Sequence, residues 1–349
     1  MKNINIEKYK SYIFETAKKI LLVDSPSGYC AHVTQLIEEI VAELGYTCYT
    51  TNCGTIIVEI DGADNSKTVA LTSHVDTLGT MVRSITENGD LKFTVVGGPI
   101  VPTLDGEYCK IVTRNGISYK GTYLSKSPAV HVYDDASSLP RTEENMIVRI
   151  DEPVRTKEQT EALGIMPGDY ILINPKTTVT KSGFLKSRFI DDKGSVACLL
   201  ALLKIMKEEG LKPQYKTKYI ITTYEEVGHG GAYLPEDVSE LLSVDMGCIG
   251  EDLSCSEYDV SICAKDSGGP YDYEMTTRLI NFAKENDISF AVDIYPHYSS
   301  DATVAMRAGN NVRTALIGPG VHASHGMERT HYLALENTVK LLILYLGLN

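Results

Sequence analysis

Residues 81–184 interrupt an otherwise regular alternation of helix and strand patterns. Before them, apolar residues at helical spacing predict helices over 5–22 and 31–44, and β-branched stretches predict strands over 55–60 and 68–72. After them, helix and strand patterns return over 194–209, 217–224, 274–287, 288–294, 300–308, 312–317 and 333–346. Alternation of this kind predicts an α/β fold, with a mixed central sheet flanked by helices.

The interrupting segment has a different composition. It contains short β-type pieces (KFTVVGG, VRIDEPV and DYILINP), many glycines and prolines, and one short helical stretch near 157–163. We therefore predict a small β-rich domain over 81–184, inserted into a discontinuous main domain of 1–80 and 185–349. The length of 349 residues agrees with two domains at roughly 150 residues each.

Composition excludes several classes of function. The formal net charge is −13 and no basic patch is present, which disfavours a nucleic-acid partner. The longest apolar runs, such as 196–203, are far shorter than the roughly 18 residues of a membrane helix, so no membrane association is expected. The eight cysteines form no CxxC pair and the N-terminal stretch lacks the apolar core of a signal peptide, which predicts free thiols in the cytoplasm. Any bound metal must then rely on His and carboxylate ligands.

Five short segments carry histidine or carboxylate groups at the ends of predicted strands or in the turns after them. Open α/β sheets bind their ligands at such positions. Each segment alone is a weak signal, because a single His or Asp in a loop is usually solvated. The five segments are His74-x-Asp76, Asp191-Asp192, Glu225-Glu226, Asp245 and His322-Ala-Ser-His325.

Each segment has a residue pattern suited to metal chemistry. In His74-x-Asp76, strand alternation places both side chains on one side, so one imidazole nitrogen can bind metal while the carboxylate holds the proton of the other. Glu225 and Glu226 lie between the apolar strand 217–224 and a glycine-rich turn. Because consecutive side chains diverge there, one carboxylate can bind a metal while its neighbour addresses a water.

The remaining carboxylates complete a two-metal set. Asp191 can share its two oxygens between two ions, which need such a bridge when they lie roughly 3.5–4 Å apart. Asp245 can complete one coordination sphere. Histidines and carboxylates without cysteine suit zinc, cobalt or manganese. We therefore predict two divalent cations, with zinc or cobalt favoured over manganese.

The order of these motifs resembles the tetrahedral-aminopeptidase family, which also contains the bacterial glutamyl aminopeptidases. The resemblance rests on SHVDTLG, RFIDDKGS, TTYEEVGHGGA, VDMG, SSDA and a closing helix with ENTVKLL, and it extends over nearly the whole chain. It implies a dinuclear metallo-aminopeptidase with a zinc-exopeptidase α/β core and a β-barrel-like insertion used in assembly. It also implies a homo-oligomer, anywhere from a dimer to a tetrahedral dodecamer.

The resemblance also assigns roles to residues. It implies Glu225 as the general base, Asp191 as the bridging ligand, and Asp301 as a neighbour of the active site. His229-Gly230 departs from the family, whose members tend to carry a Leu-Arg-like pair there. The implied metal ligands are His74, Asp191, Glu226, Asp245 and His325, with His322 as the alternative to His325.

The expected activity is removal of N-terminal residues from short peptides, by attack of a water that Glu225 deprotonates. A metal-dependent amidohydrolase that removes acyl groups is the first alternative, because the same ligands serve any amide. A glycosidase, as some relatives have been labelled, would not require metal. A metal-stabilised scaffold without activity would have no use for the second carboxylate of Glu225-Glu226.

Overall fold

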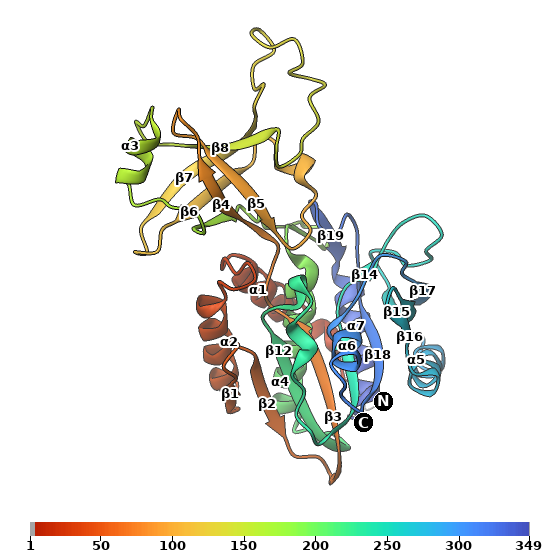
Figure 1. Ribbon diagram of the computed structural model, residues 1–349. Helices are drawn as coiled ribbons and strands as arrows, with labels where there is room; N and C mark the ends of the chain where they lie inside the picture. Colours follow the sequence, from red (N-terminus) through yellow and green to blue (C-terminus); the bar gives the residue numbers. More distant parts are fainter. Residues whose placement is uncertain (1–3, 349) are drawn as a thin grey trace. The chain divides into compact units, whose positions relative to one another are not determined.

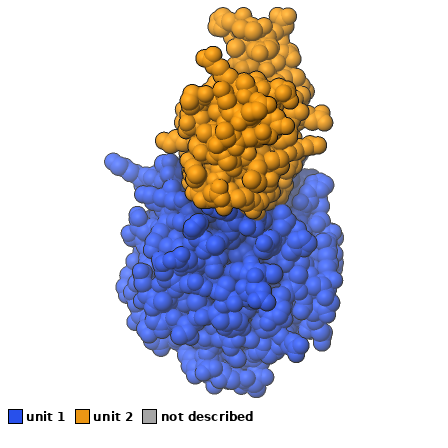
Figure 2. Space-filling model, turned by 60° about the vertical axis from the view of Figure 1, so that its left-hand side comes forward, with its two compact units in different colours: residues 1–76, 176–349 blue, residues 77–175 orange. Residues whose placement is uncertain are grey.

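The computed structural model describes residues 4–348 and divides into two compact units (Figure 2). The larger unit ends its first part at Asp76 and resumes at Lys176, and the smaller unit spans Thr77–Pro175. The predicted domain boundaries lay after residues 80 and 184. The segment that follows Lys176 groups with the larger unit because its strands β10 (Thr178–Val179) and β11 (Phe184–Ser187) form a small sheet with β19 (Glu328–His331).

The larger unit is built on a mixed sheet of ten strands (Figure 1). Strands β12, β3, β13 and β18 run parallel in its centre, whereas β2 and β15 pair antiparallel on either side. The main path is β1 (Cys48–Thr50), β2 (Ile56–Ile60), β12 (Tyr215–Thr222), β3 (Asp64–His74), β13 (Val238–Val244), β18 (Arg313–Val321), β15 (Val260–Asp266) and β16 (Gly269–Pro270), with β14 (Gly247–Cys248) beside β18 and β17 (Phe290–Ile294) beside β15.

Alternating side chains of the strands enter two separate apolar cores on opposite faces of the sheet. On β2, Ile56 and Val58 join the larger core, while Ile57 joins the smaller one on the opposite face. The larger core also takes the apolar residues of α1 (Lys10–Leu21), α2 (Ala31–Glu43), α5 (Tyr273–Glu285) and α7 (Tyr332–Tyr345), and those of α4 (Ile190–Glu209). The smaller core includes residues of α6 (Asp301–Arg307). Helices thus cover both faces, and the predicted α/β class is confirmed.

The smaller unit is a closed β-barrel. Its strands follow the order β4 (Gly79–Ile85), β5 (Leu91–Val96), β8 (Met146–Ile150), β7 (Ser118–Ser125), β6 (Tyr108–Val112) and β9 (Tyr170–Ile173). It also carries the helix α3 (Lys157–Ala162) and the 3₁₀ turn η2 (Val101–Leu104). The predicted barrel-like insertion is therefore confirmed as a fold.

The remaining 3₁₀ turns lie in the larger unit: η1 (Ile6–Tyr9), η3 (Glu225–Val227) and η4 (Gly230–Ala232). Every helix within residues 4–348 is too short or too polar to cross a bilayer. The eight cysteines are all free thiols.

Candidate metal and catalytic site

The carboxyl ends of the parallel strands meet at one edge of the sheet, and the predicted segments converge there (Figure 1). His74 is the last residue of β3, the Glu225–Glu226 pair follows β12, and Asp245 follows β13. Asp191 comes from the first turn of α4, and His325 lies in the connection between β18 and β19. Parallel strands place their carboxyl ends together, so segments far apart in sequence share one site.

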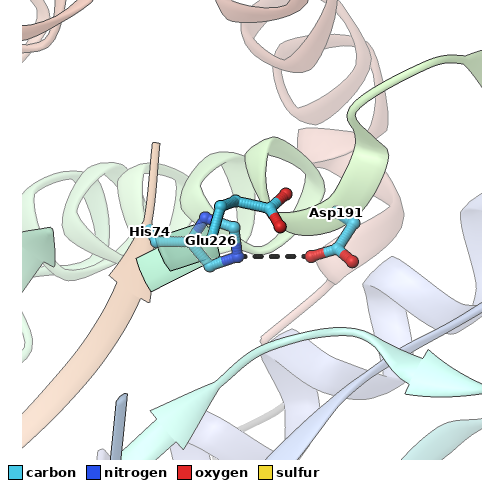
Figure 3. Close-up of side chains that lie close together, drawn as sticks. All are labelled: His74, Asp191 and Glu226. Carbon is cyan, nitrogen blue, oxygen red and sulfur yellow. Dashed lines mark hydrogen bonds and ion pairs between the residues drawn. The ribbon is translucent and has the colours of Figure 1, made fainter. Parts of the chain in front are cut away.

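The imidazole of His74 lies at the centre of the cluster and is 1% exposed. Its Nε2 is 3.2 Å from Asp191 Oδ1, 3.6 Å from Glu225 Oε2 and 4.0 Å from Asp245 Oδ2. Figure 3 shows His74 and Asp191 facing one another, with the carboxylate of Glu226 beside them. Its Nδ1 lies 3.0 Å from the backbone oxygen of Asp76, and this contact fixes the orientation of the ring.

The carboxylate of Asp76 accepts hydrogen bonds from the Glu225–Glu226 turn and also lies close to His74. It lies 3.5 Å from His74 Nδ1, a longer contact than the one made by its own backbone oxygen. Its Oδ1 accepts the backbone N–H of Glu225 at 3.1 Å and its Oδ2 accepts that of Glu226 at 3.3 Å. Ser27 donates its hydroxyl to the same Oδ2. Asp76 therefore positions both glutamates relative to His74.

The Asp191–Asp192 segment supplies two buried carboxylates with different partners. Asp191 is near His74, and its Oδ2 accepts the hydroxyl of Ser324 at 3.3 Å. Asp192 is fully buried, and its Oδ2 accepts the Ser73 hydroxyl and the backbone N–H of His74. Asp192 thus stabilises the end of β3 through these two hydrogen bonds. It also lies close to His74 and Asp245.

The structure brings His325, rather than His322, to the cluster. His325 Nε2 lies 3.6 Å from Asp191 Oδ2 and 3.7 Å from Glu226 Oε2. His322 is exposed, and its backbone N–H and oxygen bond to Arg329. The buried carboxylate of Glu328 accepts the backbone N–H of Asp191 and that of His325, both at 3.0 Å, and so ties the two segments together.

Burial and crowding of like charges shift the pKa values of these groups strongly. Burial raises the pKa of Glu225 and Glu226 well above the usual carboxyl range, and neighbouring carboxylates add to the effect. Burial also raises the pKa of Asp245, to about 7. Burial would lower the pKa of His74, but Glu225 and the other carboxylates around it outweigh burial and raise the pKa well above its ordinary value. Without a metal, the cluster therefore retains protons, and binding of a cation would displace them.

The donor set fits divalent cations. Two groups each offer ligand atoms that all lie within 4.8 Å of one another: His74, Asp191 and Glu226, and His74, Asp192 and Asp245. Within the part of the chain that the structure describes, Glu226 Oε1 is buried without a hydrogen-bond partner. A buried carboxylate oxygen left unpaired among other acids is costly unless a cation neutralises it.

The turn that carries the glutamates is packed against Asp301. Thr222, at the end of β12, donates its hydroxyl to Asp301 Oδ2 at 2.5 Å. A Cβ on Gly230 would lie 2.4 Å from Asp301 Oδ1, and one on Gly231 would lie 2.0 Å from the Asp301 backbone oxygen. The absence of a side chain at Gly231 therefore allows the turn to lie directly against the start of α6.

We expect Gly231→Ala to displace this turn and lower activity. The methyl group would meet backbone rather than a mobile side chain, so relief requires movement of η4 or α6 at a cost of about 1–3 kcal/mol. Gly250→Ala is the matched control, because the nearest atom to its added Cβ is 4.0 Å away. Thermal denaturation and peptide hydrolysis of both variants provide the measurement. A Gly231→Ala protein with the stability and activity of Gly250→Ala would contradict this packing.

Sequence reasoning missed three contributors to the site. Glu328 preserves the local pattern of the resemblance and so favours His325, but its contacts with the backbone of Asp191 and His325 are not predicted from sequence. Asp192 was noticed as half of a carboxylate pair but received no role of its own. Ser27 lies in a Ser-Pro-Ser-Gly breaker cluster that predicts a turn and nothing more.

Comparison with models of known protein families matches residues 54–341 to M42 glutamyl aminopeptidase. The chain belongs to the M42 family. Over 332 residues it is 42% identical to YhfE of Bacillus subtilis, a protein whose name assigns it provisionally as an aminopeptidase, and the match covers 95% of this chain and 96% of that one. The family and this relative make the chain an aminopeptidase, a hydrolase of peptide bonds. M42 peptidases depend on metal, which agrees with the acidic cluster around His74.

Solved structures share the whole fold of this M42 peptidase. A TET aminopeptidase from the archaeon Thaumarchaeota archaeon SCGC AB-539-E09 superposes with a TM-score of 0.85 at 20% identity and covers 96% of both chains. The TET1 peptidase of Pyrococcus horikoshii, described as assembling into a tetrahedron or a large octahedral shell, gives a TM-score of 0.82 at 22% identity, covering 96% of this chain and 99% of that one. The resemblance to tetrahedral aminopeptidases is thereby confirmed.

Proposed function

We propose that this M42 aminopeptidase acts with two divalent cations, zinc or cobalt in preference to manganese. The proposed ligands are His74, Asp191, Glu226, Asp245 and His325, with Asp191 shared between the ions. Support comes from the convergence of these side chains at one edge of the sheet and from the unpaired buried oxygen of Glu226. Divalent cations, when bound, polarise the scissile carbonyl and acidify the attacking water.

The chain's own residues then handle the protons. The carboxylate of Glu225 accepts a proton from the water as the water attacks the scissile carbonyl carbon. Glu225 passes that proton to the nitrogen of the leaving amine as the C–N bond breaks. Asp76 keeps Glu225 in place by accepting the backbone N–H of Glu225. Glu225 Oε2 lies 3.6 Å from His74 Nε2, so the base lies at the edge of the ligand set.

The acidic cluster also suits the free amine of a peptide. The free α-amine would bind the remaining metal position or a neighbouring carboxylate of the cluster. An N-acylated peptide has no free amine to bind in this way. Short peptides are the proposed substrates, because the free N-terminus must enter an almost fully buried cluster.

We further propose that the barrel unit serves assembly of a homo-oligomer, with a dimer and a tetrahedral dodecamer as the limiting cases. The assembly described for the P. horikoshii TET1 peptidase, a tetrahedron or a large octahedral shell, supports this proposal. A cytoplasmic location is also proposed, and eight free thiols agree with a reducing compartment. Light scattering coupled to size exclusion measures the oligomeric state directly.

A panel of aminoacyl-p-nitroanilides, assayed after chelation and again after addition of zinc or cobalt, tests the proposed function. We expect hydrolysis to disappear on chelation and to return with metal, and N-acetylated counterparts to remain intact. The convergence of His74, Asp191, Glu226 and Asp245 carries this expectation. Preferred hydrolysis of the N-acetylated substrates would instead indicate an amidohydrolase. Metal-independent activity on polysaccharide, with no peptide hydrolysis, would indicate a glycosidase.

A further inference from the structure

A pocket of about 740 Å³ opens beside the turn that carries Glu225. Its walls are formed within the segment 49–55, which comprises the end of β1 and the turn before β2, and within the segments 223–224 and 229–233 that flank the two glutamates. Three tyrosines and His229 supply aromatic surface, and we call this space the aromatic pocket. None of its described lining residues is an Asp, Glu, Lys or Arg. It therefore differs sharply from the acidic cluster next to it.

Sheet order places the aromatic pocket and the acidic cluster on opposite sides of Glu225. Strands follow the order β1, β2, β12, β3 and β13, at roughly 4.8 Å per step. The antiparallel pairing of Ile56 with Ile221 brings the turn before β2 to the carboxyl end of β12, where Glu225 follows. His74 and Asp245 lie one and two strands further along the same edge.

The direction of a bound peptide follows from that order, given the proposed function. The free amine of the first residue lies among the carboxylates around His74, and the scissile bond lies at Glu225. The chain after the scissile bond must then leave on the far side of Glu225. That side is formed by the residues directly after β12 and by the segment 49–55, which are two of the walls of the aromatic pocket.

We propose that the aromatic pocket receives the residue after the scissile bond and selects apolar or aromatic side chains there. Its volume lies within the roughly 300–1,000 Å³ of small-molecule sites, so it accommodates one large side chain with neighbouring backbone. A charged side chain would lose hydration there without gaining an ionic partner. Aromatic rings of the walls pack well against an aromatic ring of the substrate.

Hydrogen bonds hold the walls of the pocket together before substrate arrives. Thr223 donates its hydroxyl to the backbone oxygen of Cys53 at 2.8 Å, which joins the two main walls. The backbone N–H groups of His229 and Gly230 donate to the oxygen of Tyr224 at 2.9 and 3.1 Å. A preformed pocket of this kind favours binding, because little ordering is needed when the side chain enters.

Matched substrates test the proposal. With the N-terminal residue X that the enzyme hydrolyses best, the substrates are X-Phe-Gly, X-Gly-Gly and the amide X-NH₂, whose leaving group is ammonia. We expect kcat/KM for X-Phe-Gly to exceed that for X-Gly-Gly by about tenfold or more, the scale on which an apolar pocket discriminates. The double variant Tyr49→Ala, Tyr233→Ala should reduce this ratio to about threefold or less and leave amide hydrolysis within about twofold.

The control is Tyr273→Ala, which removes a tyrosine that is 82% exposed at the start of α5, away from the pocket. Tyr49 and Tyr233 are themselves 45% and 59% exposed, so their removal leaves the core intact. Equal kcat/KM for the two tripeptides in the wild type would overturn the proposal. So would a double variant that loses amide hydrolysis as strongly as it loses X-Phe-Gly hydrolysis. Failure of the metal-loaded wild type to hydrolyse both the tripeptides and the amide would refute the proposed function itself, and the pocket assignment with it.

Cys53 offers a second, independent test that needs no change to the aromatic walls. Its thiol is exposed on the pocket lining, whereas the other cysteines are buried or half-buried. N-ethylmaleimide adds to that thiol and fills part of the pocket. Labelling should abolish the preference for X-Phe-Gly and spare the amide, and Cys53→Ser should resist the treatment. An unchanged preference after complete labelling at Cys53 would overturn the proposal.

Discussion

Replacing Glu225 by glutamine is expected to lower kcat by roughly a hundredfold or more, which corresponds to about 3 kcal/mol of lost barrier reduction. Glutamine has the shape of glutamate, so it can occupy the same space near His74 and keep the backbone N–H bond to Asp76. It cannot accept a proton from water. The chemical step should therefore suffer while binding of peptide and metal persists.

Metal analysis by mass spectrometry and steady-state kinetics on one aminoacyl-p-nitroanilide provide the measurement. Glu251→Gln is the control, since that glutamate is exposed on a turn outside the site. The decisive combination is metal content near wild type with kcat strongly reduced and KM little changed. Wild-type turnover in Glu225→Gln at full metal content would refute its assignment as the general base.

Glu226→Gln is expected to abolish the metal-dependent gain in stability together with activity, while the metal-free protein keeps its fold. Burial and the nearby Asp191 carboxylate raise the pKa of Glu226 well above its usual value, so the metal-free protein favours the protonated form of this side chain. Glutamine matches that neutral acid in shape. A bound cation needs the ionised form, which glutamine cannot provide.

The size and the pH dependence of the effect follow from linkage. Each cation present at a hundred times its Kd should stabilise the wild type by about 2.7 kcal/mol, and the variant should gain much less. In the unfolded state Glu226 loses its proton above about pH 4.5, whereas in the folded state it keeps that proton to a higher pH. Burial of Glu226 therefore destabilises the metal-free wild type increasingly as the pH rises from about 4.5 toward the folded-state pKa. Glu226→Gln removes this contribution, so its metal-free Tm should fall less between pH 5 and 8.

Calorimetry with and without a chelator, at several pH values, measures both effects. Metal should raise the Tm of the wild type more at pH 8 than at pH 6, since fewer protons then compete for the ligands. Glu251→Gln again provides the control for a glutamate-to-glutamine change outside the site. An equal metal-induced rise in Tm for Glu226→Gln and wild type would exclude Glu226 as a ligand.

Sequence pattern alone was sufficient for the architecture and for the chemical type of the site. The change at 81–184 to short β-type pieces with many glycines and prolines indicates the barrel, because strand and helix patterns depend on local periodicity. Sequence analysis gives no residue range for the short strand β13, which carries Asp245 after its end, because seven residues of mixed character give a weak local signal. Carboxylates and histidines at strand ends identified the edge of the sheet that holds the site.

Only the tertiary structure decided how the members of the site contact one another. The resemblance favours His325 over His322, because Gly326 and Glu328 preserve the local pattern of the family, but only the connection between β18 and β19 brings His325 to Asp191 and Glu226. Glu328 reaches Asp191 across 137 residues of sequence, a contact that no local pattern encodes. Asp76, expected from its spacing to hold His74, also holds the backbone of both glutamates, because chain packing brings β3 and β12 side by side. Local periodicity determines which elements form, whereas the partners of a buried polar group depend on which elements pack around it.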